Sequence, residues 1–386
     1  QALKYFEESQ KKLMLGAYFQ DEKVVYNTGP HILFMNVFSD MHHSGLFYSM
    51  QLLFENRLGF NLYRPIGMEW FQRGYWDVAK PYNDNMGTVK QYLSLQPHYQ
   101  PVDGTVPLND LAKREFNAPY HRIIDKYHDT EHKAVTMAQF QEMDVDLIIA
   151  SIPAHWATYK KLRDELKPKA KLIFQMGNHF NEIHDFMRDG VATNLMASTI
   201  PFPVPSNWNA VFYHQEMPLI DFSYSPTNTT ITSFVHLLPR PDLYDSFRTN
   251  MPEFSFYAYG AQAPNGFLSS LSALYEKAKS TGFMWHVKPG GDGFGWNWHT
   301  AFMVGRPVIT NFSDYHDKLG GLLFKDGVTG IDLEKRPFAE SVQFAKAIAN
   351  SDQLFEMQLE SRKAFDKFVN YDFETDKIKM FLSQLV

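Results

Sequence analysis

Apolar and polar positions along the first half of the chain predict strands and helices in alternation. Near-continuous apolar runs occur in HILFMNV (31–37), DVDLIIAS (144–151) and KLIFQMG (171–177), as expected of strands buried on both faces. HWATYKKLRDEL (155–166) lies between the last two and repeats its apolar residues at helical spacing. A strand–helix–strand order with apolar strands predicts right-handed crossovers and a parallel sheet.

A second alternating series follows the polar stretch DFSYSPTNTTI (221–231), which we interpret as a linker. Its predicted strands lie in ITSFVHLLPR (231–240), EFSFYAYGA (253–261), GFMWHVKP (282–289) and RPVITN (306–311), with helical segments between them. Two predicted helices, 338–369 and 372–385, close the chain. The pattern therefore predicts two doubly wound α/β domains in tandem, residues 1–222 and 223–364, followed by a helical tail.

Composition and charge exclude several classes of protein. The chain has 386 residues, of which 44% are hydrophobic and 21% charged, as in folded globular proteins. A net charge of -6 argues against a dedicated nucleic-acid binder, which usually carries a basic surface. Cysteine is absent, which excludes a disulfide framework and a thiolate metal site and fits a cytoplasmic location. No apolar run approaches the roughly 20 residues of a membrane-spanning helix.

The stretch VKPGGDGFGWNWHTAFMVGRPVITN (287–311) carries the candidate chemistry. Its glycines cluster at the carboxyl end of a predicted strand, where a helix begins, and ligands of open α/β sheets bind there. Backbone N–H groups at a helix start suit phosphate, and Lys288 would add a full positive charge. The strict dinucleotide and P-loop glycine patterns are absent. On these residues alone, a phosphate site and a plain strand-to-helix turn fit equally well.

The same stretch resembles a known family. DGFG (292–295) and AFMVGRPVI (301–309) resemble the donor-nucleotide segment of GT-B glycosyltransferases, especially the large retaining, family-4-like group, and KDGVTGIDL (325–333) resembles that family's last donor-site turn. The family's first glutamate is Asp292 here, and its second falls on Thr300. The resemblance implies the GT-B fold, two tandem Rossmann-like domains, with the C-terminal helix 365–386 packed back on the first domain.

The resemblance also implies an activity. A GT-B enzyme of this kind moves a sugar from a nucleoside-diphosphate sugar, here most simply a UDP-sugar, to an acceptor hydroxyl, with retention expected. Helix dipoles and basic side chains stabilise the leaving diphosphate, so no metal and no other cofactor is obligatory. The donor-binding residues expected on this basis are Ser44, Gly45, Arg240, Lys288, Gly290, Gly291, Asp292, Gly293, Phe294, Gly295, His299 and Thr300.

The first domain supplies further candidates at strand ends. In DMHHSG (40–45), Asp40, His42 or His43 would be the general base of an inverting enzyme, whereas the Ser44–Gly45 backbone would face donor phosphates in a retaining one. Asp40 fits a simple turn residue as well. His179 is a further catalytic candidate, facing the donor sugar, although it equally fits an ordinary core or surface position. The predicted acceptor-binding residues are His155, Arg64 and Trp70.

Three alternatives stay open at this stage. The same fold serves nucleotide-sugar 2-epimerases, and a non-catalytic nucleotide-sugar binder would also fit the replaced second glutamate. Some enzymes of this fold glucosylate hydroxymethylated bases in DNA, so the acceptor is a glycan, a small molecule or modified DNA. Affinity for DNA that falls with salt would favour the last of these.

Overall fold

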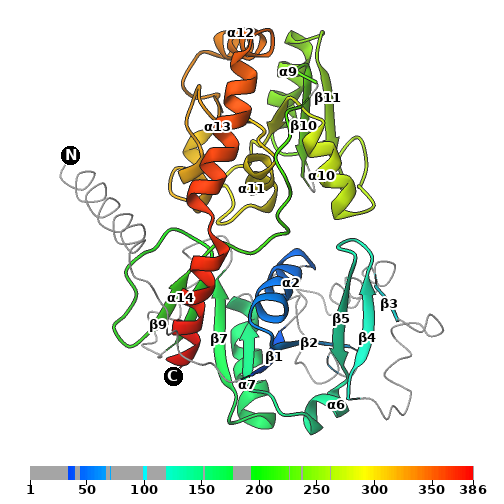
Figure 1. The fold of residues 1–386 in the computed structure, drawn as a ribbon, viewed down its shortest axis with the longest axis vertical. Coiled ribbons are helices and arrows are strands. Elements are labelled where there is room, and N and C mark those ends of the chain that lie inside the picture. The colour runs from blue at the N-terminus through cyan, green and yellow to red at the C-terminus, as the bar shows by residue number, and fades with distance from the viewer. Residues whose placement is uncertain are drawn as a thin grey trace.

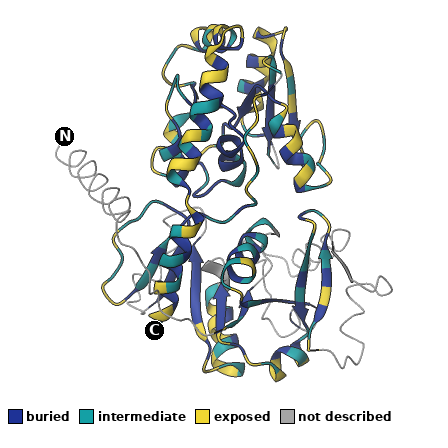
Figure 2. Cartoon of the chain, in the orientation of Figure 1, coloured by how far each residue is buried: buried dark blue, intermediate teal, exposed yellow. Residues whose placement is uncertain are grey.

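The structure is a computed structural model, and it describes residues 34–39, 44–66, 70, 99–101, 119–150, 153–176, 193–225, 227–235, 238–260 and 262–385. Within these ranges the strands form two separate sheets, stacked one above the other along the long axis in Figure 1. Helices pack against the strands of each sheet, and the residues on their outward faces are exposed (Figure 2). The two-domain α/β arrangement is therefore visible directly.

The first sheet has a parallel centre and an antiparallel edge. Its strand order is β3-β4-β5-β2-β1-β6-β7-β8-β9. The parallel strands are β1 (Asn36–Ser39), β2 (Asn61–Pro65), β5 (Thr130–Val135), β6 (Leu147–Ala150), β7 (Lys171–Met176), β8 (Asn194–Ala197) and β9 (Asn209–Phe212). Strands β3 (Tyr99–Pro101) and β4 (His121–Asp125) extend the β5 edge in antiparallel pairing. That extension is absent from the sequence prediction.

Helices connect the parallel strands as the apolar pattern predicts. They are α2 (Ser44–Gln51), the π-helical segment η2 (Leu52–Arg57), α6 (Met137–Glu142) and α7 (Pro153–Leu166). All four residues of β6 are buried, which explains the continuous apolar run from which this strand was predicted. The first strand begins later than predicted, at Asn36, and residues 31–33 lie outside the described ranges.

The second sheet is wholly parallel, with the order β11-β10-β12-β13-β14. Its strands are β10 (Thr230–Phe234), β11 (Ser255–Tyr259), β12 (Phe283–Trp285), β13 (Val308–Thr310) and β14 (Gly330–Asp332). Its helices are α9 (Pro241–Asn250), α10 (Leu271–Lys279), α11 (Trp296–Met303), α12 (Phe338–Ala349) and α13 (Gln353–Phe368), with short 3-10 turns η5 (Phe312–Asp314) and η6 (Leu319–Leu323). The single long helix predicted for 338–369 is two helices, α12 and α13.

The last helix, α14 (Tyr371–Ser383), returns to the first sheet (Figure 1). Ile378, Phe381 and Leu382 pack into the same apolar cluster as Val37 of β1. Asn209 of β9 donates a hydrogen bond from Nδ2 to the backbone oxygen of Phe381 at 3.1 Å. The chain thus crosses between the two sheets twice, once near residue 222 and once near residue 370, while the predicted domain boundary itself stays a prediction.

Candidate functional site

Strand order places a crevice at the carboxyl edge of the second sheet. The chain proceeds from β10 to β11 on one side and then to β12 on the other, so the connections leaving β10 and β12 diverge and open a crevice between them. The glycine-rich loop follows β12 and runs to the start of α11. Asn297 of α11 donates a hydrogen bond to the backbone oxygen of Phe234, the last residue of β10. The loop therefore borders the crevice.

Backbone geometry explains the glycines of this loop. Gly290, Gly291 and Gly295 have φ values of 76°, 61° and 71°, a region that residues with a Cβ rarely adopt. A Cβ on Gly291 would lie 2.2 Å from the backbone oxygen of Asp314. The N–H of Gly290 already donates to Asp314 Oδ1 at 2.7 Å. Gly290 and Gly291 thus support the loop itself before any ligand is considered.

The start of α11 offers hydrogen-bond donors. Gly295 is the N-cap residue, so no side chain caps the helix, and the N–H groups of its first turn lack intrahelical partners. Those groups and the helix dipole favour an anion at this end. Trp298 holds the helix in place, because its ring stacks on Tyr315 with centroids 3.9 Å apart and its Nε1 donates to Gly320 O at 2.9 Å.

Charged side chains near the loop are already paired with one another. Lys288 forms an ion pair with Asp292, and His286 Nε2 lies 3.8 Å from Asp292 Oδ2. Burial raises the pKa of Asp292, but His286 and Lys288 outweigh it and lower the pKa to about 2. Asp292 is therefore an anion at neutral pH. A phosphate approaching Lys288 has to compete with this carboxylate.

Arg240 lies on the connection that leaves β10, where the sequence analysis placed it. It adopts φ 51° at the start of α9 and makes two hydrogen bonds to Asp242, at 3.2 and 3.1 Å. Its side chain is 49% exposed, and exposed ion pairs of this kind contribute little stability. The guanidinium is thus available to exchange Asp242 for an anionic ligand.

The predicted residues further along α11 are buried. His299 and Thr300 are 0% and 1% exposed, and the His299 ring stacks on Phe294 with centroids 4.0 Å apart. On its other side His299 faces His214, which follows β9 in the first domain. In this conformation Phe294 and His299 contact His214 of the first domain, and the roles of Phe294, His299 and Thr300 in donor binding stay predictions.

The strand order of the first sheet reverses in the same way at β1, so a matching crevice is expected between β1 and β6. The connection after β1 contains Asp40, His42 and His43, which lie outside the described residues, as does His179. Ser44 and Gly45 begin α2, and a Cβ on Gly45 would have no heavy atom within 4 Å among the described residues. His155 lies in the first turn of α7. The starts of α2 and α7 follow β1 and β6 at the same edge of the sheet, while the chemical roles of all these candidates remain predictions.

Two predicted acceptor-binding residues are buried, each 1% exposed. Arg64 Nη1 lies 2.6 Å from His132 Nδ1, and its guanidinium lies 5.1 Å from the centroid of the Phe47 ring. Trp70 donates a hydrogen bond from Nε1 to Val135 O at 3.2 Å. Neither side chain is open to an acceptor in this conformation, and their role in acceptor binding stays a prediction.

Sequence reasoning missed a pair in the turn between β4 and β5. His128 Nδ1 lies 2.7 Å from Asp125 Oδ2, and both side chains are 1% exposed. The His128 ring packs between Tyr48 of α2 and Trp296 of α11, at centroid distances of 4.5 and 5.9 Å. In the sequence this pair is an Asp and a His three residues apart, a spacing that does not by itself indicate a site. The tertiary structure shows that the turn reaches the second domain.

This turn joins the two domains through the backbone as well. The N–H of Leu271, the first residue of α10, donates to Tyr127 O at 2.8 Å, and the Tyr127 ring packs on Phe267 at 5.3 Å. Burial raises the pKa of Asp125, but the hydrogen bond and charge of His128 outweigh it and lower the pKa. The Asp125 carboxylate is therefore ionised and orients His128.

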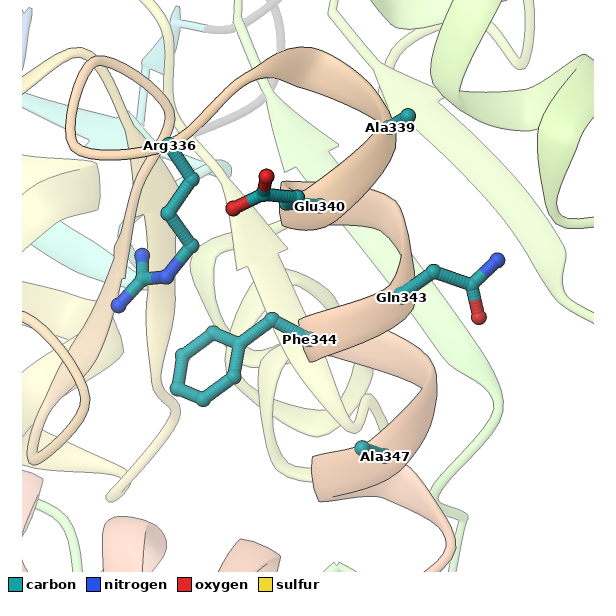
Figure 3. Close-up of a pocket in the computed structure, with 6 residues that line it drawn as sticks. All are labelled: Arg336, Ala339, Glu340, Gln343, Phe344 and Ala347. Carbon is teal, nitrogen blue, oxygen red and sulfur yellow. The ribbon is translucent and has the colours of Figure 1, made fainter.

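A surface hollow of about 550 Å³ lies elsewhere, along α12 (Figure 3). It is lined by Arg336, Ala339, Glu340, Gln343, Phe344 and Ala347. The Arg336 guanidinium lies 4.1 Å from the centroid of the Phe344 ring and forms an ion pair with Asp326 at 2.7 Å. None of the lining residues belongs to the connections that leave β10 and β12 or to those that leave β1 and β6.

Comparison with known proteins identifies the fold. No family model and no curated protein sequence matches this chain. Among solved structures, HepE of Anabaena in complex with UDP-glucose aligns over 91% of this chain and 100% of its own, with TM-score 0.56 and 10% identity. The pneumococcal O-GlcNAc transferase GtfA, in complex with UDP and GlcNAc, covers 91% and 99%, with TM-score 0.55 and 11% identity.

TarM aligns similarly, over 91% of this chain and 99% of its own, with TM-score 0.53 and 9% identity. These proteins are GT-B glycosyltransferases, so this chain has the GT-B fold, and the expectation from the sequence is confirmed. Membership of the retaining, family-4-like group stays a prediction. None of the described helices is long and apolar enough to cross a membrane.

Proposed function

We propose that this chain is a glycosyltransferase that moves a sugar from a nucleoside-diphosphate sugar, expected to be a UDP-sugar, to an acceptor hydroxyl. The observation that carries the proposal is the uncapped start of α11, placed by the glycine-rich loop at the crevice of a GT-B fold. The UDP and UDP-glucose complexes of GtfA and HepE support the choice of donor.

In this proposal the donor diphosphate lies against the first turn of α11. Lys288 leaves Asp292 and Arg240 leaves Asp242 to contact the phosphates, while the helix dipole stabilises charge that develops on the leaving group. No metal is required for that stabilisation. We propose retention, with the Ser44–Gly45 backbone facing the donor from the first domain. Proton NMR of the first-formed product would show the anomeric configuration, and inversion would favour Asp40, His42 or His43 as a base.

Thermal unfolding with nucleotides tests the donor site. UDP, GDP, ADP, CMP, UDP-glucose and UDP-GlcNAc are compared, each with Mg²⁺ and with EDTA. A ligand at 100 times its Kd adds about 2.7 kcal/mol to the free energy of unfolding. We expect the UDP series to stabilise the protein equally in Mg²⁺ and EDTA. Absence of stabilisation by every nucleotide would refute the donor site.

A lysine variant locates the site. Lys288→Met should weaken UDP binding by about 1.5–3 kcal/mol, the range for hydrogen bonds to charged groups. Lys363→Met is the matched control, because Lys363 forms an exposed ion pair with Glu360 on α13. Equal UDP affinity in both variants would remove Lys288 from the phosphate site. Binding of a UDP-sugar without release of UDP in the presence of glycans, small-molecule acceptors or hydroxymethylated DNA would instead favour a non-catalytic binder.

A further inference from the structure

A charged side chain is buried without a counter-ion near the point where the chain first crosses between the domains. Arg306 lies between α11 and β13 and is 0% exposed. Its Nη2 donates a hydrogen bond to the backbone oxygen of Ser223. Its Nε and Nη1 atoms are buried and have no acceptor among the described residues. A buried guanidinium with two unsatisfied nitrogens requires an explanation, because an uncompensated buried charge is strongly destabilising.

A neighbouring side chain adds further donors. Gln358 of α13 is also 0% exposed, and its Oε1 accepts a hydrogen bond from the backbone N–H of Ser225 at 3.0 Å. Its Nε2 is buried and has no acceptor among the described residues. A Cβ on Gly305, the residue before Arg306, would lie 2.8 Å from the backbone oxygen of Gln358. Arg306 and Gln358 therefore bind the same short stretch of chain, residues 223–225, and each has N–H groups left over.

The carboxylates of this region do not neutralise Arg306. Asp366 is bound by Arg362 of α13, whose Nε lies 2.8 and 3.0 Å from its two oxygens. Asp221 is exposed, and no carboxylate among the described residues forms an ion pair with Arg306. Burial lowers the pKa of Arg306 to about 10, so the guanidinium stays positively charged at neutral pH. The contact therefore carries a buried positive charge that the described residues leave uncompensated.

We propose that Arg306 and Gln358 bind a small monovalent anion, of the size of chloride, beneath the first crossing of the chain. The two side chains direct only N–H donors to the ion, and an anion accepts hydrogen bonds from several donors at once. A water molecule accepts such hydrogen bonds as well, but it leaves the charge of the guanidinium uncompensated. A single positive charge and complete burial favour a monovalent ion over a phosphate or a nucleotide.

The anion joins three segments of the chain. They are the connection from α11 to β13, which carries Arg306, the helix α13, which carries Gln358, and residues 223–225. An ion held here fastens the crossing to the second domain. Arg306 lies beyond the carboxyl end of α11, whereas the proposed donor site lies at its start, so this inference does not depend on sugar transfer. Unfolding releases the ion, and stability is therefore linked to the anion concentration.

Urea unfolding at constant ionic strength tests the proposal. Sodium chloride replaces sodium gluconate, whose anion is too large for a closed site. When the folded state binds one ion and the unfolded state binds none, the ratio of folded to unfolded protein rises in proportion to chloride above the dissociation constant. We expect this ratio to rise about tenfold as chloride increases from about 20 to about 200 mM. A rise of less than about twofold would overturn the anion site.

An arginine variant locates the effect of chloride. Arg306→Met removes the charge and nearly preserves the side-chain volume, so the dependence of stability on chloride should disappear. Arg248→Met is the matched control, because Arg248 forms an exposed ion pair with Asp245 on α9, and it should keep the dependence of the wild type. The same chloride dependence in Arg306→Met and the wild type would place the bound ion elsewhere and contradict the proposal.

A second variant supplies the negative charge from within the chain. Gln358→Glu keeps an acceptor for the N–H of Ser225 and places a carboxylate oxygen where the buried Nε2 lies. In gluconate this variant should be at least as stable as the wild type, and it should not respond to chloride. A variant that responds to chloride as strongly as the wild type would show that Gln358 does not border the ion, against the shared site.

Diffraction from the wild-type protein gives a readout that needs no variant. Crystals grown with bromide in place of chloride should show an anomalous peak within hydrogen-bond distance of the Arg306 and Gln358 nitrogens. Bromide peaks confined to the protein surface, with a water molecule or a carboxylate of the chain beside Arg306, would exclude the proposed ion.

Discussion

Replacing Asp292 with asparagine should have opposite effects on stability and on phosphate binding. The side chain of Asp292 is 14% exposed and its pKa is about 2, against an ordinary value of 3.8. A shift of this size corresponds to about 2.5 kcal/mol of stability at neutral pH, an order-of-magnitude figure. Asp292→Asn removes that contribution and leaves Lys288, which is partly exposed, without its carboxylate. The same change frees Lys288 for a ligand phosphate.

The sign of the pH dependence follows from linkage. Because the pKa of Asp292 is lower in the folded state, its ionised form stabilises the protein fully above about pH 4, and this stabilisation is lost as the pH falls toward 2. Urea unfolding at pH 7, 5 and 3.5 should therefore show the variant less stable by about 2 kcal/mol at the two higher values. The difference should shrink at the lowest one.

Calorimetric titration with UDP measures the second effect. The variant should bind UDP more tightly than the wild type, by up to about tenfold, because the phosphate no longer competes with a carboxylate. Asp317→Asn is the control, since Asp317 pairs with Lys318 at the surface and is 58% exposed. A stability loss below about 0.5 kcal/mol together with unchanged UDP affinity would show that the Lys288–Asp292 pair is neither structurally important nor linked to phosphate binding.

Three further predictions concern the same region. Gly291→Ala should destabilise the fold by about 1–3 kcal/mol in urea unfolding, and by more than Gly290→Ala. Both glycines have a positive φ, but a Cβ on Gly291 would clash with the Asp314 backbone whereas a Cβ on Gly290 meets nothing within 4 Å, and equal losses would mean that the clash is relieved. Because the pKa of His299 is lowered to about 3, this group should make wild-type stability fall by about 1.4 kcal/mol per pH unit between pH 6 and 4. His299→Phe lacks the titrating ring and should show a shallower fall. Identical slopes would contradict burial of a neutral His299. Arg240→Ala should weaken UDP binding by about 1.5–3 kcal/mol while leaving stability in urea unfolding nearly unchanged, since its ion pair is exposed. Unchanged UDP affinity would exclude Arg240 from the site.

The apolar pattern was sufficient to predict the central parallel strands of both sheets. Strands buried on both faces are continuous apolar runs, and such runs mark β6, β7 and β12 in the sequence. The glycine-rich loop was equally visible, because positive φ angles at close range restrict the residue type locally. Each of these features depends on neighbours within about ten positions, so local sequence contains the information.

The antiparallel edge of the first sheet could not be predicted in this way. Strands β3 and β4 are short and lie in a polar stretch, and their pairing with β5 is set by partners elsewhere in the chain. The environments of Arg64 and Trp70 also depend on partners elsewhere in the chain and could not be predicted from local sequence. Their residue types suggested a binding surface, but β2 is covered on both faces, and each side chain instead satisfies a group in or beside β5.

The sequence by itself determined the strand and helix periods, the two-domain α/β class and the position of the glycine-rich loop. Only the tertiary structure decided which charges meet. The carboxylate of Glu374 reaches His214 across 160 residues of sequence, and His128 reaches Trp296 from a turn in the other domain. Periodicity is a property of adjacent residues, whereas these contacts exist because the chain crosses between the domains and returns, which no local pattern encodes.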